Sequence, residues 1–81
     1  MKIKSGKIYK ILYLDHSTGE HRGSDYEEIK LWKLVDIGKA ILVKDTYVVL
    51  ANSWGKNENE ETITKYTCII RSAMLSAEEL K

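Results

Sequence analysis

Residues 40–52 read Ala-Ile-Leu-Val-Lys-Asp-Thr-Tyr-Val-Val-Leu-Ala-Asn, and this stretch decides the fold. It is almost wholly apolar and rich in β-branched side chains, which favour strands over helices. The polar interruption 44–46 contains Asp45, which forms turns by accepting hydrogen bonds from the backbone of its own loop. The stretch therefore predicts extended structure with a tight turn inside it.

Two further segments have the composition of strands. Residues 7–14 are rich in Ile, Leu and Tyr and end in the turn-forming cluster 15–19. Residues 62–75 begin with Thr, Ile and Tyr in the manner of a half-buried strand. The intervening stretch 52–61 is polar and rich in Asn and Gly, which predicts a flexible hairpin loop. The sequence therefore predicts a mainly β chain.

Residues 24–38 fit either a helix or a strand. Ser24 and Glu27 have the spacing of a capping box, and Gly38 is placed to end a helix. The same residues also alternate acceptably as a strand, although Lys33 interrupts the apolar positions. The sequence leaves both interpretations open.

Length and composition restrict the class of protein. The chain has 81 residues, which we expect to form a single domain, residues 1–81. One cysteine, Cys68, allows no internal disulfide, and no zinc-type spacing occurs. A domain this small gains little stability from its own core, so self-association is a natural expectation. The start lacks an export signal and no stretch is apolar enough to span a bilayer, so we expect a cytoplasmic protein without membrane contact.

The charge balance indicates which nucleic acids the chain could bind. Thirteen basic side chains stand against twelve acidic ones, for a net charge of +1. Proteins that hold duplex DNA through its phosphates carry a stronger basic bias. A local site for a few nucleotides of single strand remains compatible, because base stacking supplies much of that binding.

No arrangement of side chains in the sequence is typical of catalysis. There is no phosphate-binding glycine loop, Ser-His-Asp set or paired-carboxylate signature. We therefore expect neither an enzyme nor a cofactor. Two histidines and two carboxylates in residues 15–21 could ligate a metal, but their spacing is unspecific and favours a solvated hairpin tip.

Three further side chains have structural interpretations. Cys68 alternates with Tyr66 and Ile70, which predicts a small buried hydrophobe rather than a nucleophile. Trp32 and Trp54 are expected to anchor the core or an interface.

From about residue 39 to residue 80 the order of residues resembles the Sm/LSm family, including its Hfq branch. The first motif of that family matches Asp45-Thr46-Tyr47-Val48-Val49-Leu50. The second is similar to residues 69–76, Ile-Ile-Arg-Ser-Ala-Met-Leu-Ser. Residues 1–38 match nothing in the family. The resemblance implies a small, strongly bent, five-stranded Sm-like barrel of the SH3 type, with at most one short helix.

The resemblance also implies an RNA-binding site built from two turns. Tyr47 would stack on a base and Arg71 would stack on a base or hold a phosphate, with Asp45 and Ser72 beside them. Two departures matter: Val49 stands where most members have a base-reading Asn, and Ser72 stands where the second motif has Gly. Structural interpretations remain open: Tyr47 packing in the barrel, and Arg71 pairing with Asp45 or Glu78.

Three functions follow as hypotheses. The leading one is a homo-oligomeric ring of about five to seven subunits that binds short single-stranded U- or A-rich RNA, with edge strands joining the subunits. The alternative is an SH3-like protein-interaction module, such as a phage-encoded accessory or inhibitor protein. The third is a ring-forming structural protein that binds no nucleic acid.

Overall fold

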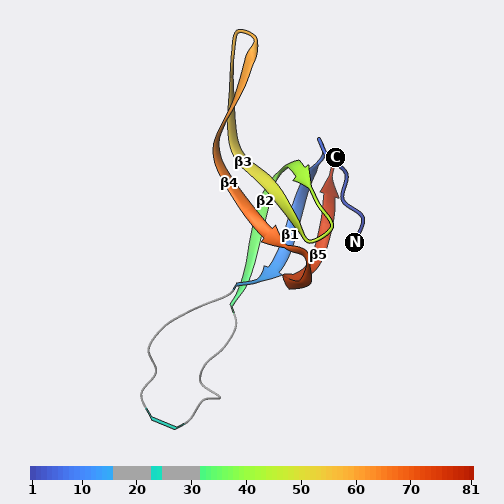
Figure 1. Cartoon of the computed structure of the whole chain (residues 1–81), viewed down its shortest axis with the longest axis vertical. Helices are drawn as coiled ribbons and strands as arrows, with labels where there is room; N and C mark the ends of the chain where they lie inside the picture. The colour runs from blue at the N-terminus through green and yellow to red at the C-terminus, as the bar shows by residue number, and fades with distance from the viewer. Residues whose placement is uncertain (16–22, 25–31) are drawn as a thin grey trace.

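Five strands make up nearly all of the regular structure. The computed structural model describes residues 1–15, 23–24 and 32–81. The elements are β1 Ile8–Leu14, β2 Lys33–Val43, β3 Tyr47–Asn57, β4 Glu60–Ile70, the 3₁₀ turn η2 Arg71–Ala73, and β5 Met74–Leu80 (Figure 1). The prediction of a mainly β chain is confirmed.

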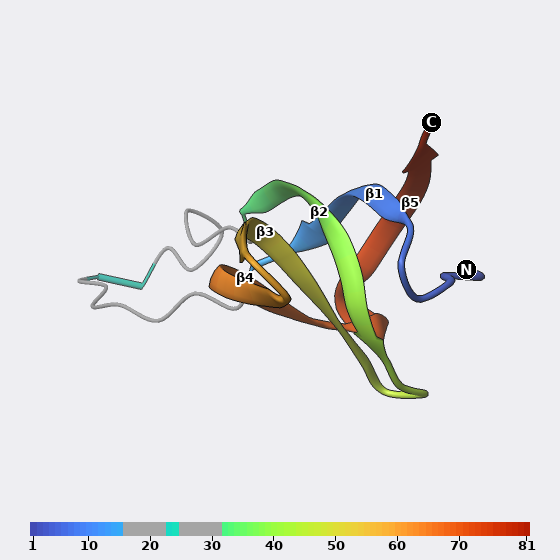
Figure 2. The ribbon, with the colours of Figure 1, turned by 90° about the horizontal axis from the view of Figure 1, so that it is seen from above.

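The strands form one antiparallel sheet in the order β4-β3-β2-β1-β5. The sheet is strongly curved, as the view from above shows (Figure 2). Its two end strands, β4 and β5, are not hydrogen-bonded to each other, so the sheet is open. Each end strand therefore presents one edge that no other described strand pairs.

The pairing between neighbouring strands contains register shifts. The β2–β3 pairing shifts between Ala40 and Leu42, and bulges of this kind bend and twist a strand. Gly38 lies beside this bend, and a Cβ atom built on it would lie 2.6 Å from the carbonyl oxygen of Ala51. Only glycine therefore allows β2 and β3 to approach this closely.

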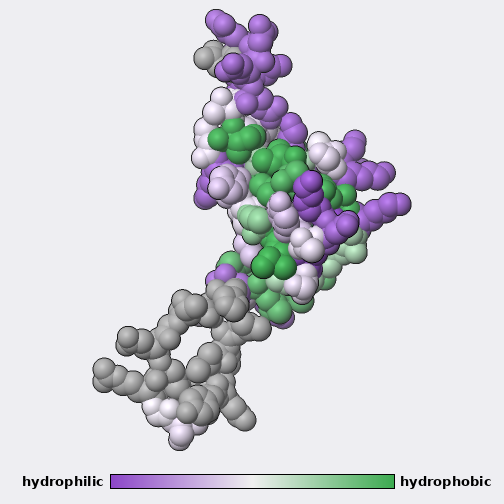
Figure 3. Space-filling view, in the orientation of Figure 1, coloured by the Kyte–Doolittle hydropathy of each residue, from purple (hydrophilic) through white to green (hydrophobic). Residues whose placement is uncertain are grey.

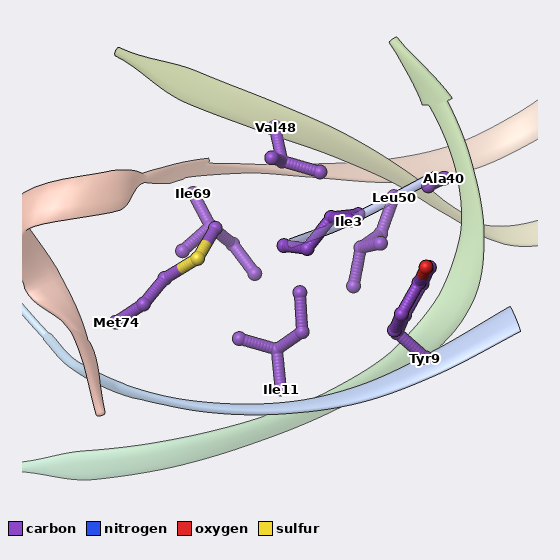
Figure 4. Packing of buried hydrophobic residues seen from close by; sticks show 8 residues of the cluster. All are labelled: Ile3, Tyr9, Ile11, Ala40, Val48, Leu50, Ile69 and Met74. Atoms are coloured by element: carbon purple, nitrogen blue, oxygen red, sulfur yellow. The ribbon is translucent and has the colours of Figure 1, made fainter. Parts of the chain in front are cut away.

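The core is a cluster of eight buried side chains inside the curved sheet (Figure 4). They are Ile3, Tyr9, Ile11, Ala40, Val48, Leu50, Ile69 and Met74. Ile3 comes from outside the sheet, and backbone hydrogen bonds hold its segment in place: Gly6 N–H donates to Ala40 O at 2.7 Å, and Ala40 N–H donates to Lys7 O at 2.9 Å. Residues 1–7, which carry no regular structure, thus complete the core.

The predicted flexible loop 52–61 is wrong over most of its length. Strand β3 continues to Asn57 and β4 begins at Glu60, so only Glu58 and Asn59 turn. Glu58 takes the left-handed conformation that the turn requires, with φ of 54°. We call residues 53–65 the hairpin arm. Backbone pairing between its two strands, not apolar composition, stabilises the arm, whose tip is hydrophilic (Figure 3).

One other strand prediction is corrected, and one open alternative is decided for part of its length. The strand expected over 62–75 ends at Ile70, where η2 turns the chain into β5, and β5 continues to Leu80. Of the ambiguous segment 24–38, residues 33–38 belong to β2 because they pair with β1. Residues 25–31 lie outside the described part of the chain, so the capping-box hypothesis is not tested there.

Candidate functional site

The turn between β2 and β3 presents the first predicted motif. Lys44 N–H donates to Tyr47 O at 2.9 Å and closes the turn, which leaves Asp45 and Thr46 exposed at its tip. An apolar strand on each side and polar residues at 44–46 explain why the chain reverses here. Tyr47 follows directly as the first residue of β3 and is half-buried.

The second motif lies against this turn. Tyr47 and Ile70 are cross-strand partners, and Arg71 N–H donates to Thr46 O at 2.9 Å. Backbone contacts therefore hold Arg71 and Ser72 beside Asp45 and Tyr47. All four predicted site residues meet in what we call the turn cluster, residues 44–47 and 70–72.

The guanidinium of Arg71 is fixed by two backbone carbonyls. Nε donates to Lys44 O at 2.7 Å, and Nη1 donates to Met1 O at 3.0 Å. Arg71 thus joins three segments: the β2–β3 turn, η2 and the first residues of the chain. Neither ion pair considered for it, with Asp45 or Glu78, is present, since the one ion pair among the described residues joins Lys39 to Glu61.

Basic residues predominate in the segments that Arg71 joins. Arg71 is joined to Lys44 and to Met1, and Lys2 follows Met1 in the chain. Lys2, Lys44 and Arg71 are therefore close in the chain to these contacts, with Asp45 as the one acidic residue beside them. Sequence reasoning did not include Lys2 or Lys44 in the site, because nothing local indicates that residue 71 reaches residue 1.

A shallow apolar hollow adjoins η2. It has a volume of about 160 Å³ and is lined by Tyr13, Leu14, Asp15, Cys68, Ile69, Ile70 and Ala73. Ile70 and Ala73 flank the Arg71–Ser72 pair in the chain, so the hollow lies next to the turn cluster. Its lining is mainly apolar.

Several structural interpretations of single side chains are wrong. Cys68 is exposed rather than buried. Trp32 is 69 % exposed and Trp54 is 40 % exposed, so neither anchors the core. Trp54 instead lies under the ammonium of Lys39, which is 5.8 Å from the ring centroid, a cation–π distance. Whether either tryptophan anchors an interface stays a prediction.

Three of the four possible metal ligands in residues 15–21, His16, Glu20 and His21, lie outside the described residues. Among the residues that the structure describes, no group of three metal-ligating side chains is present. In the described ranges no helix is long and apolar enough to cross a membrane.

Comparisons with known proteins provide no identification. No protein-family model, no curated protein and no solved structure matches this chain. The function therefore has to be argued from the turn cluster and the sheet.

Proposed function

We propose that this chain is an Sm-like subunit that binds short single-stranded RNA at the turn cluster and assembles into a homo-oligomeric ring. In this proposal the open five-stranded sheet corresponds to the strongly bent, SH3-type barrel of that family. The observation that carries the proposal is the hydrogen bond from Arg71 N–H to Thr46 O, 2.9 Å long. It brings together two motifs that are about 25 residues apart in the sequence.

The chemistry of the turn cluster suits a nucleotide. The carbonyls of Lys44 and Met1 fix the guanidinium plane of Arg71, so little rotamer entropy is lost when it binds a phosphate or stacks on a base. Tyr47 supplies a flat ring beside it for stacking. The basic residues are local, which is consistent with a few bound nucleotides on a chain of nearly neutral charge.

The open sheet supports assembly through its edges. Strands β4 and β5 each have one edge without a partner among the described strands. Exposed apolar side chains lie on both strands, with Tyr66 and Ile70 67 % and 61 % exposed on β4 and Leu75 43 % exposed on β5. Pairing β4 of one subunit with β5 of the next would satisfy both edges and cover these side chains.

RNA binding is tested with labelled U-rich and A-rich oligonucleotides by fluorescence anisotropy. Tyr47→Leu keeps apolar bulk but removes the stacking ring, so we expect the dissociation constant to rise about tenfold. Tyr47→Phe is the matched control, because it keeps the ring and should keep the affinity. Unchanged affinity in Tyr47→Leu, with unfolding midpoints equal to the parent, would remove Tyr47 from the site.

Assembly is tested separately by light scattering on the eluting protein. A mass of about five to seven times the 9.3 kDa chain supports the closed ring. A monomer that binds neither oligonucleotide would contradict the proposal and favour the protein-interaction module. A ring that binds no RNA would favour the structural assembly protein.

A further inference from the structure

The outward side of β1 and its two neighbours is unusually apolar. On β1 the residues Tyr9 and Ile11 are buried, at 3 % and 0 % exposure, so the alternate positions Ile8, Lys10, Leu12 and Leu14 lie on the opposite side of the sheet. The strand register places Leu80, Ile37 and Val35 on that same side, across from Ile8, Lys10 and Leu12 respectively. We call this surface the β1 outer face.

Six aliphatic side chains make up most of this face. They are Ile8, Leu12, Leu14, Val35, Ile37 and Leu80, contributed by three adjacent strands (Figures 1 and 2). Val35 and Ile37 are 51 % and 52 % exposed. An antiparallel sheet normally has one apolar face over the core and one polar face in water. This part of the sheet is apolar on both sides, which is typical of an interaction surface.

The charged positions on the face are mainly basic. They are Lys10, Lys33, Lys39 and Glu78. Lys39 is already paired with Glu61, its Nζ lying 3.1 Å from Oε1. Lys10 and Lys33 have no carboxylate within ion-pair distance in the part of the chain that the structure describes. Two ammonium groups therefore remain to select a partner.

The spacing of those two groups defines what a partner must present. Lys33 lies across from Leu14, four positions along β1 from Lys10. At the rise of an antiparallel strand, their backbones are about 13 Å apart along the strand direction. A partner would need two carboxylates at that separation with aliphatic side chains between them.

We infer that the β1 outer face binds an acidic, amphipathic segment of a partner protein. Its aliphatic side chains would cover Val35, Ile37 and Ile8, and its carboxylates would pair with Lys10 and Lys33. The charge complementarity required of the partner follows from the two unpaired lysines. This surface is separate from the turn cluster, so the inference does not depend on RNA binding.

Other occupants fit the face less well. Two copies placed face to face would bring together surfaces on which lysines outnumber glutamate. The acidic tip of the hairpin arm of another copy, residues 58–61, carries no apolar side chain to cover the aliphatic positions. A single-stranded nucleic acid would find no arginine on this face, and the one aromatic ring at its border, Trp54, already lies under the ammonium of Lys39.

The test uses ¹⁵N-labelled full-length protein titrated with two blocked synthetic peptides. In one peptide Glu and Val take turns at every second position with Ser between them, so that an extended chain presents both on one side with Glu every four residues. In the other peptide Lys replaces every Glu. We expect only the acidic peptide to shift amide resonances in 8–14, 33–39 and 76–80. Lys10→Glu and Ile37→Thr should each raise its dissociation constant about tenfold. Lys56→Glu and Leu42→Thr, exposed residues elsewhere on the sheet, are the matched controls and should leave it unchanged.

Other results would overturn the inference. These are no shift with the acidic peptide, equal shifts with the basic peptide, or a preference for phosphatidylserine vesicles over the acidic peptide. A change in molar mass on Ile37→Thr would show instead that the face joins copies of this chain. Ile37→Thr keeps a β-branched residue at an exposed strand position, so the variant should fold. None of these readouts depends on RNA binding. The proposed function can therefore fail in Tyr47→Leu while this inference stands, and the reverse is also true.

Discussion

The phenol of Tyr13 on β1 donates a 2.5 Å hydrogen bond to Oδ2 of Asp36 on β2. The two side chains lie on the same side of the sheet, since Tyr13 pairs with Leu34 and Ile11 pairs with Asp36. Burial, the hydrogen bond to Asp36 and the negative charges of Asp36 and Asp15 raise the pKa of Tyr13 to about 12. The contact therefore requires the protonated phenol.

This contact predicts a loss of stability at high pH. The pKa of Tyr13 is about 12 in the folded chain, above its ordinary value of 10.0, so the folded state holds the phenolic proton more tightly. The stabilisation is complete below pH 10 and disappears as pH rises from 10 to 12. We expect the difference in unfolding free energy between the parent and Tyr13→Phe to shrink across that window, measured by urea unfolding at each pH.

A spectroscopic titration checks the same assignment directly. Absorbance of tyrosinate, compared between the parent and Tyr13→Phe, gives the pKa of this one side chain. Asp36→Asn removes the negative charge and should move that pKa toward 10. A Tyr13 that titrates with the exposed tyrosines in the parent would contradict the assignment.

Gly38 should tolerate no side chain. A Cβ atom there would lie 2.6 Å from the backbone oxygen of Ala51, so Gly38→Ala must push β2 and β3 apart at their bend. We expect a loss of about 1–3 kcal/mol in unfolding free energy. Gly55→Ala is the matched control, because nothing lies within 4 Å of its Cβ position and its φ is not positive. Equal stability of the two variants in urea would mean that β2 and β3 are not packed this closely.

Truncation of Leu50 should lower the free energy of unfolding much more than truncation of Leu42. Leu50 is 0 % exposed within the core cluster, whereas Leu42 on β2 is 39 % exposed. Leu50→Ala removes buried methyl groups and leaves a cavity, at a cost of about 2–5 kcal/mol. Leu42→Ala should cost under about 1 kcal/mol, since much of that side chain is already hydrated. Thermal unfolding of both variants measures the contrast, and equal losses would contradict the burial pattern.

Arg71 should attach the first residues to the sheet. Arg71→Met keeps the aliphatic stem but removes the donors to Lys44 O and Met1 O, and we expect it to cost about 1–3 kcal/mol. Amide hydrogen exchange of Gly6 and Ala40 should accelerate, because their backbone bonds join residues 6–7 to β2. Lys56→Met on the exposed hairpin arm should change neither quantity. Unchanged exchange in Arg71→Met would show that Ile3 alone holds the segment.

The sequence predicted most of the strands because their local composition is decisive. Residues 7–14 and 40–52 combine β-branched and aromatic side chains with polar turn residues, so β1, the end of β2, the turn 44–46 and the start of β3 were all expected. The outer part of β3, residues 53–57, and the start of β4, residues 60–61, were missed because most of these residues are polar. The order of the hairpin arm comes from pairing with the returning strand, for example Trp54 with Ile63, and single-segment composition does not contain that information.

The error at Cys68 has a different physical reason. Alternation correctly placed Tyr66, Cys68 and Ile70 on one side of a strand, but it does not say which side faces the core. The core side holds Ile69, 1 % exposed, and Tyr66 and Ile70 are the exposed pair. Which side is buried depends on the direction in which the whole sheet curves, and the composition of β4 alone does not contain that information.

The candidate site was predictable to the level of its four residues. The motif resemblance placed Asp45, Tyr47, Arg71 and Ser72 together, and the structure brings them together in the turn cluster. The partner of Arg71 was not predictable, because Met1 is 70 positions away and carries no local signal. A side-chain contact of that separation depends on the whole sheet being in place.

The hairpin arm has a consequence for how this chain can change in length. Residues 48–51 of β3 pair with β2, whereas residues 53–57 pair only with β4. Insertions or deletions in the outer part of the arm therefore leave the core contacts intact, provided that both strands change by the same number of residues. If that number is even, each remaining side chain also keeps its face. Related chains should accordingly differ in arm length in matched steps of two residues per strand, while the distance from Gly38 to the turn at 44–46 stays constant.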